Sequence, residues 1–163
     1  MFKFRLIAAF MLGAALALSV APVDAARDKK KDEKAAVSKT GRTDKPTQSS
    51  QKFVKAFGKI ADLYEADQYD EALAGLAKLD TPKATPYEKS KIAQLRGFIA
   101  YNQDDLVTGI EQFNIAVATD ALPNVEHFQL KLTLAELYHM NDQLPESVAA
   151  FDDWLKDAEA VTG

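Results

Sequence analysis

Two histidines are the side chains of this sequence best suited to metal binding or proton transfer. His127 and His139 lie twelve residues apart in one segment with helical periodicity. At the usual helical rise this spacing separates them by about 18 Å along the axis, too far to share one metal ion. The chain has no cysteine. We therefore expect no metal site, and we expect His139 to be a surface or groove side chain.

Acidic pairs are the other residues that could support catalysis. Asp104-Asp105 and Asp152-Asp153 are adjacent in the sequence, and neighbours on a helix point in different directions. Such pairs are typical of helix capping and solvation, and they do not form a dyad for general acid–base chemistry. The sequence also contains no nucleophile elbow, P-loop, dinucleotide-binding glycine pattern or zinc-binding His-Glu-x-x-His motif. We predict a protein that is not an enzyme and uses no cofactor.

The charges around these residues are unevenly distributed along the 163-residue chain. Residues 26–50 carry eight basic and four acidic side chains, whereas residues 51–163 carry ten basic and nineteen acidic ones. The longer segment is therefore strongly acidic. This balance argues against nucleic acid as a partner, because contacts to phosphate need a basic face.

The N-terminal residues have the pattern of a secretory signal peptide. Lys3 and Arg5 precede the apolar run 6–20, and Pro22 is followed by small residues up to Ala25. The apolar run has fifteen residues, whereas a membrane-spanning helix needs about 20. We expect residues 1–25 to be cleaved after Ala25, which predicts a periplasmic protein with no membrane span after cleavage, and the extracellular medium is the less favoured compartment. An uncleaved membrane anchor is the alternative.

Residues 26–52 contain almost no large apolar side chains. Such a segment cannot bury enough surface to offset the entropy lost on ordering, so we expect a disordered, charged linker. Its basic run 29–31 could contact anionic lipid or an acidic partner, but a solvated tether is the more usual role of a charge run.

Residues 53–163 show helical periodicity, and no stretch alternates with the period of a strand. Thr85-Pro86, with Glu88 three residues after the threonine, has the form of a capping box at a helix start. Polar turns separate pairs of apolar stripes. We predict an all-α fold of three helical hairpins, at about residues 53–80, 85–120 and 123–160.

Small residues recur at matching places in the three hairpins. One lies late in each first helix and another lies early in each second helix, where small facing side chains let antiparallel helices pack closely. Aromatic or leucine side chains then fill the space further along. The small residues are Ala61, Gly97 and Ala135 in the first helices, and Ala72, Gly109 and Ser147 in the second helices.

This pattern resembles the tetratricopeptide repeat. Gly97, Gly109, Phe113 and Ala116 match its small, small, aromatic and alanine signature. The sequence departs from that family in its period of 36–38 residues rather than 34, and in the missing tryptophan of the first helix. The resemblance implies a short right-handed solenoid of three hairpins. In the third hairpin, the residues that match the repeat signature are Ala135, Tyr138, Ser147 and Phe151.

A narrower resemblance covers about residues 85–158. The stretches "TPYEKSKIAQLRGFIAY", "DALP" and "TLAELYHMNDQLPESVAAFDDWL" are similar to periplasmic repeat proteins found with TonB–ExbB–ExbD energy-transducing systems. Those relatives are longer and have more repeats. The resemblance implies a role in the same envelope process.

In tetratricopeptide repeats the first helices form the inner wall of the array, which implies a groove for a protein or peptide of the cell envelope. Exposed aromatic side chains are frequent anchors in such grooves. Phe98 and Tyr101 could be such anchors. The alternative is that they pack in the core between the second and third hairpins, and this alternative applies more to Phe98 than to Tyr101. Carried over position by position, the implied partner-binding groove comprises Lys55, Asp62, Glu65, Lys91, Gln94, Phe98, Tyr101, Asn102, Gln129, Leu132, Glu136 and His139.

The last hairpin raises a second candidate surface. Solenoids normally cap their final apolar face with a polar helix, and none follows Trp154 in this sequence. Val148, Trp154 and Leu155 are therefore candidates for a C-terminal docking face, unless Trp154 packs inward.

Two functional hypotheses follow from these surfaces. The first is a non-catalytic periplasmic adaptor that binds a segment of an envelope protein, within TonB-dependent energy transduction. The second is a homo-oligomeric scaffold or regulator of peptidoglycan or outer-membrane assembly, which associates through its C-terminal face.

Overall fold

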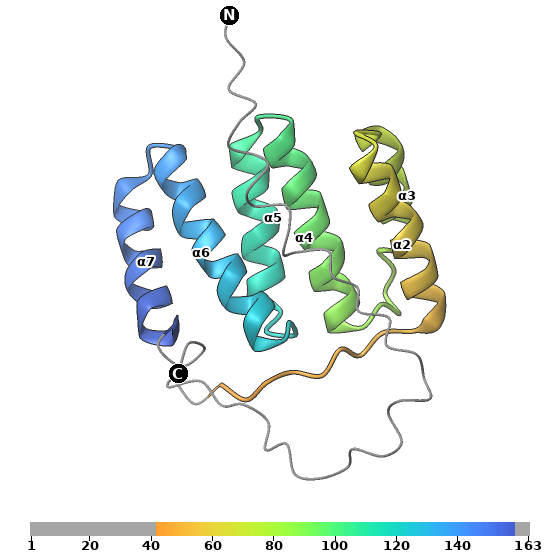
Figure 1. Ribbon diagram of the computed structural model, residues 1–163, viewed down its shortest axis with the longest axis horizontal. Coiled ribbons are helices and arrows are strands. Elements are labelled where there is room, and N and C mark those ends of the chain that lie inside the picture. The colour runs from red at the N-terminus through yellow and green to blue at the C-terminus, as the bar shows by residue number, and fades with distance from the viewer. Residues whose placement is uncertain (1–41, 159–163) are drawn as a thin grey trace, which may run out of the picture. The chain divides into compact units, whose positions relative to one another are not determined.

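The computed structural model describes residues 42–158, with side chains up to residue 156, and all of them belong to one compact unit. The predicted signal peptide and most of the predicted linker lie outside the described residues. Within the described range every regular element is a helix, which confirms the all-α part of the predicted fold (Figure 1). Its helices are α2 (Gln51–Glu65), α3 (Tyr69–Leu79), α4 (Pro86–Asn102), α5 (Leu106–Ala118), α6 (Asn124–Met140) and α7 (Leu144–Ala158).

Consecutive helices pack in pairs. Helix α2 packs on α3, α4 on α5, and α6 on α7, and each pair is joined to the next through α3–α4 and α5–α6 contacts. Figure 1 shows the pairs α6–α7, α4–α5 and α2–α3 following one another across the molecule. No helix within residues 42–158 has both the length and the apolar character that crossing a membrane requires.

The same backbone turn closes the first helix of every pair. Asp67, Asp104 and Asp142 each adopt a positive φ, of 58°, 62° and 56°, and aspartate is one of the few residues other than glycine that tolerates this conformation. The residue after each aspartate donates its amide to the carbonyl five residues earlier, as in a Schellman cap. These bonds are Gln68 to Leu63, Asp105 to Ala100 and Gln143 to Tyr138, all at 2.9 Å.

The small residues bring the paired helices together, as the sequence predicts. A Cβ atom added at Gly109 would lie 3.6 Å from the carbonyl oxygen of Gly97, so α4 and α5 approach closely there. In the last pair, Ser147 Oγ donates a 2.9 Å hydrogen bond to the Ala135 carbonyl. All six of these small residues are buried.

An apolar cluster joins the second and third helix pairs. Phe113 is fully buried beside Gly97, and Leu122, from the loop between α5 and α6, is fully buried in the same cluster. Leu130, Leu134 and Leu137 extend the cluster along α6. Helices α4, α5 and α6 therefore share one core.

The capping box expected at the start of α4 is present. Thr85 Oγ1 accepts a hydrogen bond from the Glu88 amide at 3.1 Å, and Glu88 Oε2 accepts one from the Thr85 amide at 2.9 Å. Pro86 occupies the first helical position. This start fixes where the second helix pair begins.

Candidate partner-binding surface

The predicted groove residues divide into three groups by exposure. Gln94 is buried, and six others are partly buried: Lys91, Phe98, Tyr101, Asn102, Leu132 and Glu136. The exposed ones come from the two ends of the set, on α2 and α6. They are Lys55, Asp62, Glu65, Gln129 and His139.

Two of the predicted groove residues, Asn102 and Lys91, connect neighbouring helix pairs, and Gln94 supports Lys91 from within α4. Asn102 Nδ2 donates a 2.9 Å hydrogen bond to the Tyr64 hydroxyl, which joins α4 to α2. Lys91 Nζ lies 2.7 Å from Gln94 Oε1 and 2.8 Å from Glu126 Oε2, which joins α4 to α6. The polar groups of these residues are engaged in hydrogen bonds and an ion pair within the protein. They therefore stabilise the packing of the helix pairs and are poorly placed to contact a partner.

The aromatic residues of the predicted groove pack on the shared core. The rings of Phe98 and Phe113 meet edge to face, with centroids 5.0 Å apart. Phe98 and Tyr101 both lie against the apolar cluster of α4, α5 and α6. Phe98 therefore packs in the core and does not stand exposed in a groove. Tyr101 is also partly withdrawn from solvent.

Glu136 is a predicted groove residue whose carboxyl group is partly withdrawn from water. Burial raises the pKa of its carboxyl group above the ordinary 4.5, because water that would stabilise the anion is excluded. A cationic group brought by a partner would stabilise the charged form.

The exposed groove residues keep their polar groups available. Within residues 42–156, the side chains of Lys55, Asp62, Glu65 and His139 form no hydrogen bond or ion pair. His127, by contrast, is buried, with its ring edge to face against Phe128 at 5.4 Å. No cluster of metal-ligating side chains occurs in the described part of the chain.

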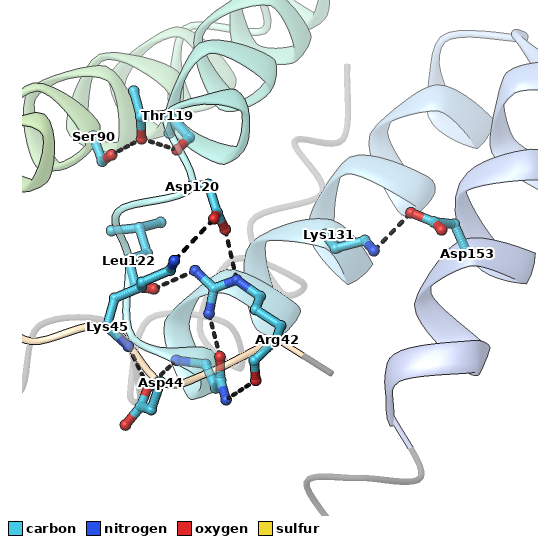
Figure 2. A network of polar contacts seen from close by, with 11 residues as sticks. Arg42, Asp44, Lys45, Ser90, Thr119, Asp120, Leu122, Lys131 and Asp153 are labelled. Carbon is cyan, nitrogen blue, oxygen red and sulfur yellow. Dashed lines mark hydrogen bonds and ion pairs between the residues drawn. The ribbon is translucent and has the colours of Figure 1, made fainter. Parts of the chain in front are cut away.

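The C-terminal helix α7 presents an apolar face. Val148 is 61% exposed and Leu155 is 55% exposed, whereas Trp154 is half-buried. Leu144, which the sequence-based prediction did not include, is also 55% exposed and continues the same face. Lys131 of α6 pairs with Asp153 at 2.6 Å and holds α7 in place beside it (Figure 2).

A feature that the sequence did not indicate lies at the edge of the array. Residues 42–50, here called the edge strap, were expected to be part of a disordered linker that ended at residue 52. Instead they follow the edge of the array from the start of α6 to the start of α2, and α2 itself begins at Gln51 (Figure 1, orange). The difference arises because polar contacts replace the apolar burial that this segment lacks.

The first half of the edge strap binds the loop before α6 (Figure 2). Arg42 Nε lies 2.7 Å from Asp120 Oδ1, and its guanidinium also donates to the Leu122 carbonyl at 2.7 Å and to Asn124 Oδ1. Asp44 Oδ1 accepts a 2.6 Å hydrogen bond from the Asn124 amide at the start of α6. Burial by itself raises the pKa of Asp120, but Arg42 and Lys45 outweigh that effect and hold it below the ordinary 3.8.

The second half of the edge strap binds the start of α4. Thr85 Oγ1 donates to the Gln48 carbonyl at 2.7 Å. Glu88 Oε1 accepts hydrogen bonds from the Ser50 amide at 2.9 Å, the Ser50 hydroxyl at 3.0 Å and the Ser49 hydroxyl at 3.3 Å. The strap therefore connects all three helix pairs along one edge.

Comparison with models of protein families, with curated proteins and with solved structures finds no match to this chain.

Proposed function

We propose that this chain is a non-catalytic, tetratricopeptide-like adaptor of the periplasm, which uses no cofactor and binds a segment of another envelope protein. TonB-dependent energy transduction is the process that the sequence resemblance favours. The proposal draws support from three helix pairs with one repeated Schellman cap, since such repetition is how solenoid arrays build an extended wall.

The observation that carries the proposal is the set of exposed polar side chains on the first helices. Glu65 and His139 lie near the ends of α2 and α6 and make no hydrogen bond or ion pair with the described residues. The chain between them is braced by the Asn102–Tyr64 and Lys91–Glu126 contacts. A braced wall loses little conformational entropy when it binds, which favours capture of a peptide by a rigid groove.

Site-specific photo-crosslinking in cells tests this proposal. A crosslinking residue at Glu65 or at His139 is expected to capture the same envelope protein. Glu71 and Glu111, which are exposed on the second helices α3 and α5, serve as control positions. The proposal is contradicted if the control positions capture the same protein as Glu65 and His139 do. It is also contradicted if neither Glu65 nor His139 captures any protein.

The apolar face of α7 favours a second candidate function, a homo-oligomeric scaffold or regulator of peptidoglycan or outer-membrane assembly. Leu144, Val148 and Leu155 expose more than half of their surface there, and exposed apolar patches often mark association sites. Multi-angle light scattering separates the candidates. A concentration-dependent dimer that Val148→Glu abolishes supports the scaffold, whereas a monomer at high protein concentration counts against it.

A further inference from the structure

A hollow lies between the start of α2, the end of α3 and the loop that precedes α4. Its volume is about 560 Å³, within the range of roughly 300–1,000 Å³ that is usual for small-molecule sites. Phe53, Leu79, Pro82 and Ala84 supply apolar lining. The hollow is separate from the predicted groove residues, none of which lines it.

Three lysines also line the hollow: Lys52, Lys78 and Lys83. All three are exposed, and none forms an ion pair with another side chain of residues 42–156. Residues 51–163 contain only ten basic side chains against nineteen acidic ones. The grouping of three lysines therefore reverses the charge of the domain locally.

The acidic groups near these lysines are already engaged. Glu88 is only 4% exposed, and its carboxylate accepts hydrogen bonds from Ser49, Ser50 and Thr85. Asp80, at the end of α3, pairs with Arg96 at 2.7 Å. The lysine ammonium groups are consequently left to water or to a bound anion.

We propose that this hollow binds an organic anion with an aliphatic tail, such as a fatty acid or an alkyl phosphate. The apolar lining takes the tail, because burial of methylene groups is favourable. The lysines hold the head group, and their aliphatic stems extend the apolar wall while the charges stay at the rim. Since three positive charges meet one buried carboxylate, a dianionic head binds more tightly than a monoanionic head of equal chain length.

Two helix-start amides beside the hollow are already bonded within the protein. The Phe53 amide of α2 is bound by Ser50 Oγ at 3.1 Å, and the Glu88 amide of α4 is bound by Thr85 Oγ1 at 3.1 Å. Recognition of the anion therefore depends on the lysines, and binding weakens as salt screens them.

Isothermal titration of the full chain with octyl phosphate, octanoate, octanol and octyltrimethylammonium tests the proposal. All four are used below the concentrations at which they form micelles. Octyl phosphate is expected to bind most tightly, octanoate more weakly, and the neutral and cationic compounds least. Equal binding of the cationic compound, or no binding of octyl phosphate, overturns the proposal. If the protein binds both octyl phosphate and phospholipid vesicles, the natural ligand is a membrane lipid. If it binds octyl phosphate but not vesicles, the natural ligand is a free anion.

Charge-reversed variants locate the site. Lys78→Glu/Lys83→Glu is expected to weaken octyl phosphate binding about tenfold, since an exposed charge pair contributes up to about fivefold and two are reversed. The control, Lys59→Glu/Lys156→Glu, makes the same change in net charge at exposed lysines outside the hollow, and it should bind as the wild type does. Equal losses in both variants would mean that overall charge alone governs binding, and would overturn the assignment.

Amide chemical shifts provide an independent map of the site. Titration of the labelled protein with octyl phosphate is expected to move the signals of residues 50–53 and 78–84. The exposed apolar face of α7 is the competing surface, marked by Val148 and Leu155. Shift changes confined to that face would overturn the proposal, because an apolar surface without the three lysines would then be sufficient.

Discussion

Replacement of Gly97 by alanine tests how closely α4 and α5 pack. A Cβ atom at this position would lie 2.4 Å from Cε1 and 2.5 Å from Cδ1 of Phe113. Both approaches are far shorter than van der Waals contact. The ring cannot easily move away, because Phe113 is 0% exposed and meets Phe98 edge to face at 5.0 Å. The substitution therefore forces strain into the core that α4, α5 and α6 share.

Two opposing effects decide the size of the change. Alanine is favoured over glycine inside a helix by about 1 kcal/mol. Overpacking of a filled core costs about 1–3 kcal/mol, and the rigid, fully buried ring places Gly97→Ala at the upper end. We expect the free energy of unfolding to fall by about 2 kcal/mol, read from urea unfolding followed by far-UV circular dichroism.

Two other glycines serve as matched controls. At Gly58 in α2 an added Cβ atom has no neighbour within 4 Å, so Gly58→Ala should stabilise the protein by up to about 1 kcal/mol. At Gly109 the nearest atom would be the Gly97 carbonyl oxygen at 3.6 Å, an ordinary contact. Gly109→Ala should therefore be neutral or mildly stabilising.

If Gly97→Ala is as stable as the wild type, the close packing against Phe113 is not what requires glycine at this position. A double-mutant cycle with Phe113→Leu supports the mechanism further. The smaller side chain should remove most of the penalty of Gly97→Ala, which means that the two changes are strongly non-additive.

Two further predictions concern the edge strap. Burial by itself raises the pKa of Glu88, but the hydrogen bonds that it accepts, from Ser50 foremost, outweigh this and hold the pKa below the ordinary 4.5. Its charged form therefore stabilises the fold above about pH 4.5, and this stabilisation is lost as the pH falls through the lowered pKa. Glu88→Gln should be less stable by about 2 kcal/mol at neutral pH, and a deficit that persists unchanged in acid would contradict this. Arg42→Ala should cost about 1–2 kcal/mol and increase amide exchange at the start of α6, because it removes hydrogen bonds to Asp120 and to the chain that follows it. Lys45→Ala is the control for that change, since the side chain of Lys45 makes only a surface ion pair, with Asp120 at 3.2 Å. An equal loss of stability in both variants would contradict the role given to Arg42.

The sequence predicted the helices well because their signals are local. The Thr85-Pro86 start with Glu88 forms the expected capping box, since a cap depends on residues within one helical turn. The positive φ of Asp104 and its counterparts was not foreseen, because aspartate favours several turn conformations and only the packing of the next helix selects one.

The candidate groove was harder to predict because exposure depends on distant residues. Phe98 and Asn102 occupy positions that face a partner in the resembled repeat class, yet here Phe98 meets Phe113 and Asn102 meets Tyr64. The hydrogen bond to Tyr64 spans 38 residues. No local pattern in the sequence reports such a contact.

What the sequence by itself determined is the all-α class, the pairing of helices and the close approach at small residues such as Gly97 and Gly109. These follow from periodicity, turn chemistry and side-chain size, which each residue carries with it. The tertiary structure decided which polar side chains stay free. It also decided that Arg42 binds a loop about 80 residues away and that Lys52, Lys78 and Lys83 gather around one hollow. Those arrangements depend on how the helix pairs stack on one another. Stacking brings together residues that are far apart in the sequence, and their sequence separation does not indicate how close they lie in the folded protein.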